Sequence, residues 1–365
     1  MLKEFVQMRR DRLTFAMIVG IPIVQVLLFG FVINTDPKAL PTALVDYDRT
    51  QLTRSIAAAL ANTGYFAFVA TRPDAVTADE LVARGDVQFA VVFPAGFSRK
   101  LMRGERPSLL VAADATDPAA TGNALAALSQ AGAFALRHDL DGALARLAPG
   151  AAPFDIDVQR RYNPEGVTAY NIVPGLLAVI LQLTMVMMTA FAITRERERG
   201  TYEGLLATPV LRTEVMVGKI TPYIVVGLVQ SAIIVAAARY LFDVPMLGSL
   251  PLLAGTMMVY IAALLSLGYA ISTLAANQLQ AMQMTFFFFL PTMLLSGFMF
   301  PFRGMPRWAQ WLGEAFPATH FLRIVRGILL KGNGAGDVAA HLWPIALFLL
   351  VVSTIAMWRY RQTLD

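Results

Sequence analysis

Residues 195–210 read RERERGTYEGLLATPV, and a long apolar segment lies on each side of them. The charges at 195–199 cannot enter the hydrocarbon of a bilayer, where one central charge costs about 2.5–3.5 kcal/mol even on the most lenient insertion scale. The stretch therefore lies in water or against another protein, close to two membrane spans. This pattern indicates a membrane protein with a docking surface on the segment.

The composition is typical of a polytopic membrane protein. Of the 365 residues, 56% are hydrophobic and 15% are charged, whereas soluble domains carry about 25% charged residues. The net charge of +5 indicates basic loops at one membrane face and not nucleic-acid binding. The chain has no Cys, which excludes disulfides, thiolate catalysis and Cys-based metal sites.

Six apolar segments are long enough, or nearly so, to cross a hydrocarbon core of about 30 Å. They predict a polytopic α-helical membrane protein with six transmembrane helices, at residues 13–33, 172–193, 220–238, 250–274, 282–300 and 342–358. At about 20 residues, the first is longer than the roughly 7–15 apolar residues of a signal peptide, so we expect it to be retained.

Lys and Arg near the span ends predict the orientation. The basic residues of 1–12, those of 195–219, and Arg359 with Arg361 all fall on one side of a six-span topology. We expect that side to be the cytoplasm and both termini to lie there, although the basic residues at 303–331 fall on the opposite side.

Residues 34–171 form a long polar insertion between the first and second spans. Apolar runs predict strands at 42–46, 65–70, 88–93 and 109–113, and helical patterns occur at 50–62, 78–84, 95–103 and 117–147. This alternation predicts an α/β domain in which helices cover a small sheet. The six-span topology makes the domain extracytoplasmic, in the periplasm.

Two further segments are expected to lie along the membrane surface. Residues 1–12 place Leu2, Phe5 and Val6 on one helical face, which fits a cytoplasmic interfacial helix or a ragged start to the first span. The apolar run at 317–330 is short and contains two Arg residues, so the segment 301–340 is expected to be re-entrant or interfacial. Residues 172–365 thus form a five-span transmembrane domain.

The segment 195–219 is expected to hold a short amphipathic helix in the cytoplasm. Thr201 can cap its start, Glu203 suits the positive end of its first turn, and Pro209 ends it. Thr213 can cap a second helix that runs into the third span. The plainer interpretation is a charged loop that follows the positive-inside rule. However, Glu contributes little to that rule, and here Arg and Glu alternate.

Several stretches of the chain resemble the ABC type-2 transporter permeases, and most of all the drug-exporter-like branch with a large periplasmic domain. The resemblance keeps its order and spacing over nearly the whole chain. The matching pieces are 195–209 with Gly218-Lys219, Tyr162-Asn163-Pro164-Glu165, Val173-Pro174-Gly175, Pro317, Arg326-Gly327 and Lys331-Gly332.

This resemblance implies that the segment after the second span is seated on a separate ATPase subunit. The matching docking residues are Arg195, Glu196, Glu198, Gly200, Thr201, Glu203 and Pro209. It also implies a second permease copy, as a homodimer or heterodimer. A periplasmic adaptor with an outer-membrane channel is a further implied partner.

The sequence lacks the G-x-x-x-x-G-K-[ST] motif of a nucleotide site. ATP and Mg²⁺ are therefore expected on the partner ATPase, and we expect no cofactor, metal site or catalytic residue on this chain. The six apolar segments contain no Asp, Glu, Lys or Arg. That absence disfavours a carrier driven by protons or sodium, which usually needs ionisable groups near the midplane.

Polar and sulfur-containing side chains in three spans are candidates for a substrate path. Methionine adapts its shape to varied ligands, although such residues also pack helices together, and that interpretation stays open. The candidates are Gln182, Met185, Thr189, Gln230, Gln283, Thr292 and Ser296.

The sequence thus predicts the permease subunit of an ATP-driven exporter in the bacterial inner membrane, a transport subunit and not an enzyme. Its cargo is expected to be hydrophobic or amphiphilic and drug-like. The alternative is a membrane-anchored periplasmic ligand sensor or assembly scaffold without transport. Four spans beyond the pair around the inserted domain, with no cytoplasmic output domain, favour the exporter.

Overall fold

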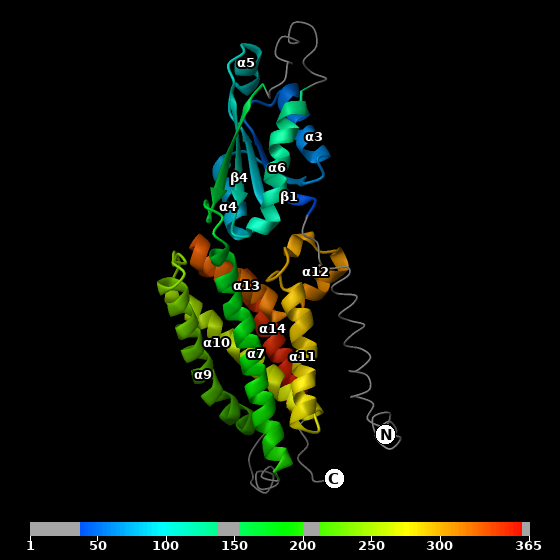
Figure 1. The fold of residues 1–365 in the computed structure, drawn as a ribbon, viewed down its shortest axis with the longest axis vertical. Helices are drawn as coiled ribbons and strands as arrows, with labels where there is room; N and C mark the ends of the chain where they lie inside the picture. The colour runs from blue at the N-terminus through cyan, green and yellow to red at the C-terminus, as the bar shows by residue number, and fades with distance from the viewer. Residues whose placement is uncertain (1–36, 137–152, 200–211, 360–365) are drawn as a thin grey trace. The chain divides into compact units, whose positions relative to one another are not determined.

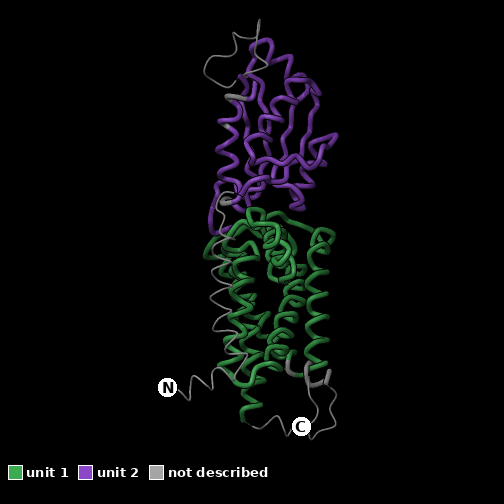
Figure 2. The backbone as a smooth tube through the Cα atoms, turned by 90° about the vertical axis from the view of Figure 1, so that its right-hand side faces the viewer, with its two compact units in different colours: residues 1–33, 172–365 green, residues 34–171 purple. Residues whose placement is uncertain are grey.

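The computed structural model describes residues 37–136, 153–199 and 212–359. The chain divides into two compact units, residues 34–171 and residues 1–33 with 172–365, which Figure 2 shows in different colours. The predicted interfacial helix at 1–12 and first span at 13–33 lie outside the described residues.

The unit at 34–171 contains a sheet flanked by helices (Figure 1). Within its described residues the sheet has five strands in the order β2-β1-β3-β4-β5. Strands β3 and β4 run antiparallel, and the other neighbouring pairs are parallel. The strands are β1 Leu40–Asp46, β2 Phe66–Arg72, β3 Phe89–Phe93, β4 Ser108–Asp114 and β5 Asp155–Arg161. The first four fall on the predicted runs, and β5 is an addition.

Alternating side chains of the strands supply a separate apolar core on each face of the sheet. Along β3, Phe89 and Val91 pack into the core beneath α3 (Gln51–Asn62), α5 (Phe97–Met102) and α6 (Pro118–Phe134), whereas Ala90 and Val92 face α4 (Ala75–Arg84). The predicted helix at 117–147 ends early, at Phe134, because the chain turns at 135–136 and buries Leu136 in the first core.

Four helices in the described part of the chain are long and apolar enough to cross a membrane. They are α7 Thr168–Glu198, the Ile220–Tyr240 part of α9 (Arg212–Tyr240), α10 Leu250–Leu274 and α14 Ala335–Arg359. Each contains one of the predicted spans. Thr213, predicted as the N-cap of the helix that runs into the third span, lies within α9, which the structure describes from Arg212 onward.

Helix α11, Gln278–Leu295, covers most of the segment predicted at 282–300 but is not one of these four helices. Its first two turns carry three glutamines, which lower its hydropathy. The helix also ends before residue 300, and Gly297 has a left-handed backbone with φ +82°. The fifth predicted segment is therefore a helix that is shorter and more polar at its start than expected.

Helix α10 contacts α9, α11, α13 and α14, and it lies very close to α7. A Cβ added at Gly268 would be 2.6 Å from the backbone oxygen of Val186 on α7. Earlier on α10, the buried Tyr260 donates to the backbone oxygen of Ala178 on α7 (3.1 Å) and stacks on Phe321 (centroids 4.0 Å apart). Small residues at such crossings let membrane helices approach closely.

The segment at 301–340 consists of short elements followed by the start of α14. A 3₁₀ turn at Phe302–Gly304 leads to α12 (Arg307–Glu314) and α13 (Pro317–Arg326), and a π-helical turn follows at Gly327–Lys331. The helix predicted at 317–330 thus changes its winding at Gly327, whose backbone oxygen accepts from the N–H of Asn333 (3.0 Å). The re-entrant or interfacial placement of this segment stays a prediction.

Candidate functional site

The charged end of α7 carries the first of the predicted docking residues. Arg195, Glu196 and Glu198 lie in the last turns of the helix, whereas the prediction placed them in a loop. The helix continues because the N–H of Arg199 still donates to the backbone oxygen of Arg195 (3.0 Å). Arg195 and Glu198 are exposed and Glu196 is half-buried. The other docking candidates, Gly200, Thr201, Glu203 and Pro209, lie outside the described residues.

Glu198 binds the first residue of α11. One carboxylate oxygen accepts from the backbone N–H of Gln278 (2.8 Å), and the other accepts from its side-chain amide (2.5 Å). The backbone N–H of Gln280, the third residue of the helix, donates to the side chain of Asn277, which is the N-cap (2.8 Å). Two carboxylate or amide oxygens therefore satisfy N–H groups that have no partner within the helix.

Arg197 binds the other side of the same connection. Its Nη1 donates to the backbone oxygens of Ser272 (3.1 Å) and Ala275 (3.4 Å) at the C-terminal end of α10. We call these contacts, from Arg197 and Glu198 to Ser272, Ala275 and Gln278, the clasp. The clasp attaches the end of α7 to the α10–α11 connection, about 80 residues further along the chain.

Sequence reasoning missed the partners in the clasp. A usable signal was present, because Asn277 is a good N-cap immediately after the apolar segment 250–274. In a six-span topology, the connection after that segment lies on the same side as residues 195–219. The sequence pattern did not indicate which charged side chain of 195–199 reaches the α10–α11 connection.

The substrate-path candidates on α7 are buried between helices. Gln182, Met185 and Thr189 recur at helical spacing, and each is at most 2% exposed. The sulfur of Met185 lies so close to Gly227 of α9 that a Cβ added to this glycine would be 2.9 Å from it. Thr189 lies against Gly268 of α10. Met185 and Thr189 therefore contribute to helix packing.

Gln182 differs from its two neighbours on that face. Its side-chain nitrogen is buried and has no hydrogen-bond partner among the described residues. A buried donor left unpaired costs about 1–3 kcal/mol. Such a donor inside a span is the kind of group that a bound solute with an acceptor oxygen would satisfy.

The remaining path candidates belong to α9 and α11. Gln230 is half-buried, and its side-chain oxygen accepts from the hydroxyl of Thr184 on α7 (3.0 Å). Gln283 is also half-buried. Thr292 and Ser296 are buried, and their hydroxyls donate to backbone oxygens of their own helix, those of Phe288 (2.8 Å) and Met293 (3.4 Å).

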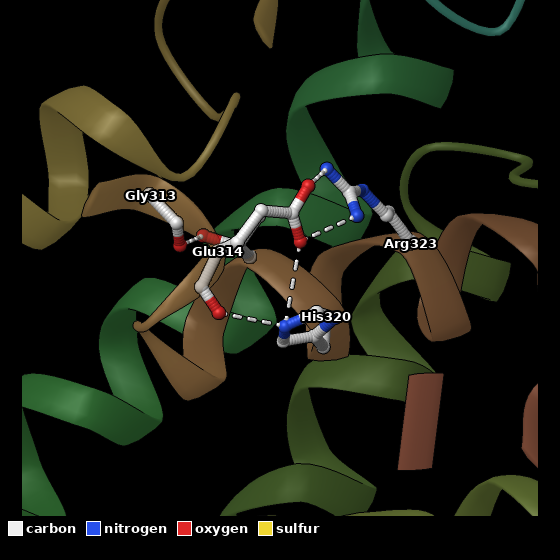
Figure 3. Close-up of polar contacts among 5 residues, drawn as sticks. Gly313, Glu314, His320 and Arg323 are labelled. Carbon is white, nitrogen blue, oxygen red and sulfur yellow. Dashed lines mark hydrogen bonds and ion pairs between the residues drawn. The ribbon is translucent and has the colours of Figure 1, made fainter. Parts of the chain in front are cut away.

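A second polar cluster holds α12 to α13 (Figure 3). Arg323 donates to both carboxylate oxygens of Glu314, at 3.0 and 2.7 Å. His320 donates from Nε2 to the backbone oxygen of Glu314 (2.9 Å), and the same nitrogen lies 3.5 Å from its carboxylate. The hydroxyl of Thr319 donates to the backbone oxygen of Gly313 (2.6 Å). The ring of His341 on α14 lies 5.9 Å from that of His320.

The cluster sets the charge of its members. Burial acts to raise the pKa of Glu314, but the hydrogen bonds and positive charge of Arg323 outweigh it and bring the pKa below its ordinary value of 4.5. Burial lowers the pKa of His320 below its ordinary value of 6.5, although the bond to Glu314 acts in the opposite direction. At neutral pH the cluster is thus an ion pair with a neutral imidazole against it.

Comparison with known proteins gives the family. A family model described as "ABC-2 family transporter protein" matches residues 12–358. The chain belongs to the ABC-2 transporter family.

Several named relatives of this ABC-2 chain are permeases of Escherichia coli strain K12. The "Probable multidrug ABC transporter permease YbhR" is 29% identical over 99% of this chain and 96% of its own length. The "Inner membrane transport permease YhhJ" is 30% identical over 100% of this chain and 96% of its own length. The "Probable multidrug ABC transporter permease YbhS" is 28% identical over 91% of this chain and 88% of its own length.

Proposed function

We propose that this chain is the permease subunit of an ATP-driven exporter that moves hydrophobic or amphiphilic, drug-like compounds out across the inner membrane. The observation that carries the proposal is the family match over 12–358, and the names of YbhR and YbhS support the cargo class. The described apolar helices support a membrane location.

The proposed topology has six spans. Residues 13–33 and the helix α11 supplement the four helices that are apolar enough to cross a membrane. The α/β unit at 34–171 is then inserted between the first and second spans and lies in the periplasm. Both termini and the segment 195–219 lie in the cytoplasm, and α12 and α13 lie at the periplasmic surface.

Power comes from a separate ATPase subunit that binds ATP and Mg²⁺. The segment 195–209 docks on this subunit, with Glu203 and Glu196 pairing with basic groups and Gly200 allowing close backbone approach. The exposed charges at the end of α7 support this proposal, because they lie directly before the segment. Closure of the ATPase would push this segment and rock the spans.

The transport path lies between two permease copies, in a homodimer or a heterodimer, and it is lined by the candidates on α7, α9 and α11. Gln182 supports a contact with cargo because its buried side-chain nitrogen has no partner among the described residues. A periplasmic adaptor and an outer-membrane channel would receive the cargo from the periplasmic unit.

Co-purification with an ABC ATPase tests the proposal, and the neighbouring reading frame is the first place to look for its gene. In vesicles, lipophilic compounds should stimulate ATP hydrolysis by the complex. Glu203→Lys should reduce hydrolysis to the unstimulated rate while the chain still inserts into the membrane. Glu105→Lys, at an exposed position of the α/β unit, is the matched control and should keep the stimulation. Equal stimulation in both variants would contradict the docking role.

Thiol labelling tests the topology independently. The chain has no Cys, so a single Thr201→Cys variant carries one reactive group. In intact cells a membrane-impermeant maleimide should leave this thiol unlabelled, and permeabilisation should expose it. Asp74→Cys, in the α/β unit, is the control and should react in cells whose outer membrane alone has been opened. Labelling of the Thr201→Cys variant in such cells would overturn the orientation.

A further inference from the structure

The clasp joins helix ends of complementary polarity. The N-terminal end of α11 carries unpaired N–H groups and a partial positive charge, and the Glu198 carboxylate accepts from it. The C-terminal end of α10 carries unpaired carbonyls and a partial negative charge, and the Arg197 guanidinium donates to it. Adjacent residues of α7 therefore cap two different helices, each with the charge that suits it.

The clasp uses groups that docking would otherwise need. Both carboxylate oxygens of Glu198 already accept hydrogen bonds from Gln278. An arginine or lysine of an ATPase would have to share carboxylate oxygens that Gln278 already holds in one orientation. Glu198 is thus better suited to binding within the chain than to binding a partner.

The helix that the clasp holds leads to the far end of the unit. Helix α11 ends at Leu295, and α12 lies against that end so closely that a Cβ on Gly313 would be 2.6 Å from the backbone oxygen of Leu295. Gly313 precedes Glu314, which binds α13 through Arg323. A displacement of the α7 end can therefore pass along α11 to α12 through a close backbone contact, and from α12 to α13 through the Glu314–Arg323 pair.

The geometry points to Arg197 and Glu198 as positioning residues that make the α10–α11 connection move together with the ATPase-docking segment. This inference rests on the proposed function and refines it: the segment 195–209 docks through residues other than Arg197 and Glu198, and the clasp transmits the displacement to α11. Loss of the clasp should leave ATPase binding intact and reduce transport for each ATP hydrolysed.

An exchange of the two interacting side chains tests the inference. Gln278→Glu places a second carboxylate against Glu198, and transport per ATP should fall by roughly three- to tenfold. In the double variant Glu198→Gln/Gln278→Glu, the amide and the carboxylate trade places and both hydrogen bonds can form again. Transport per ATP should return to within about twofold of the wild type. Gln51→Glu, at the exposed first position of α3, is the matched control.

Cross-linking provides a test that does not depend on the stability of these variants. The chain lacks Cys, so Glu198→Cys/Gln278→Cys can be joined by a short bis-thiol reagent without side reactions. The unlinked double variant has lost the Glu198–Gln278 bonds and should transport less for each ATP than the wild type. If the α7 end and the α10–α11 connection move together, linking them should bring transport per ATP back toward that of the wild type. A linked protein that binds ATPase but no longer transports would overturn the inference.

The outcomes separate the two proposals. Failure of the wild-type complex to bind the ATPase, or to respond to compounds, would refute the proposed function and with it the clasp. Normal binding and stimulation in every variant, with unchanged transport in Gln278→Glu, would refute the clasp alone. Loss of transport in Gln278→Glu without recovery in the exchanged pair would also refute it.

Discussion

The crossing of α7 and α10 predicts a steric effect that can be measured at one residue. Gly268 on α10 is buried, and a Cβ at this position would lie 2.6 Å from the backbone oxygen of Val186 and 2.9 Å from the Cβ of Thr189. Ordinary contacts begin at 3.4 Å. Gly268→Ala therefore requires the helices to separate by about 0.8 Å, and no side chain can rotate to relieve the contact with a backbone carbonyl.

The size of the effect follows from two opposing terms. Overpacking of a tight contact costs about 1–3 kcal/mol, while alanine is favoured over glycine within a helix by roughly 0.5–1 kcal/mol. Gly255→Ala, in the same helix, is the matched control because nothing lies within 4 Å of its added Cβ. The propensity gain is common to both variants, so the difference between them isolates the steric cost of about 1–3 kcal/mol.

Thermal unfolding of the purified chain in detergent measures this difference. For a domain of about 200 residues each kcal/mol shifts the midpoint by roughly 2–4 °C. The midpoint of Gly268→Ala should therefore lie about 5 °C below that of Gly255→Ala. Transport should also be weakened in Gly268→Ala, because the path candidate Thr189 faces the displaced helix. Equal midpoints for the two variants would refute the close crossing of α7 and α10.

Three further predictions concern Tyr260 and the polar cluster of α12 and α13. Tyr260→Phe removes the hydrogen bond to the backbone oxygen of Ala178, and the free energy of unfolding should fall by about 1 kcal/mol. Tyr260→Ala also removes the buried ring and should lower the free energy of unfolding by about 3–5 kcal/mol. Thermal midpoints measure both effects. In Arg323→Lys the single ammonium group cannot form the two parallel bonds to both oxygens of Glu314. Because the pair is partly exposed, the free energy of unfolding should fall by only about 0.5–1 kcal/mol. An unchanged stability in this variant would contradict the paired geometry. Since the folded-state pKa of His320 lies below 6.5 and that of Glu314 below 4.5, the unfolded chain binds more protons near each value. Stability should therefore decrease as the pH falls below 6.5 and again below 4.5. His320→Gln should reduce the first decrease and leave the part that the neighbouring His341 contributes.

The local features of the fold could be predicted because each depends on a contiguous segment. Membrane helices follow from apolar length, and α10 begins and ends at the predicted residues 250 and 274. Strands β1, β3 and β4 are apolar because helices cover both faces of the sheet there, which makes them recognisable runs. Strand β2 lies at the sheet edge and is recognisable from the apolar run at its start. Strand β5 reads DIDVQRR and lies at the sheet edge beside β4, where one face and one side stay polar. Its alternating pattern is short and charged, and no strand was predicted there.

The clasp shows why the candidate site could be predicted only in part. The adjacent charges at 195–199 were interpreted as one docking group. Residues two apart on a helix are rotated by about 200° around its axis, so they point in nearly opposite directions. Glu196 and Glu198 therefore cannot serve the same surface, and only the phase of α7 at its last turn decides which of them reaches Gln278. That phase depends on how α7 packs on α10 far from its charged end, at contacts such as Gly268 with Val186. The role of Glu198 is thus fixed by packing about three turns away and not by the charge pattern around it.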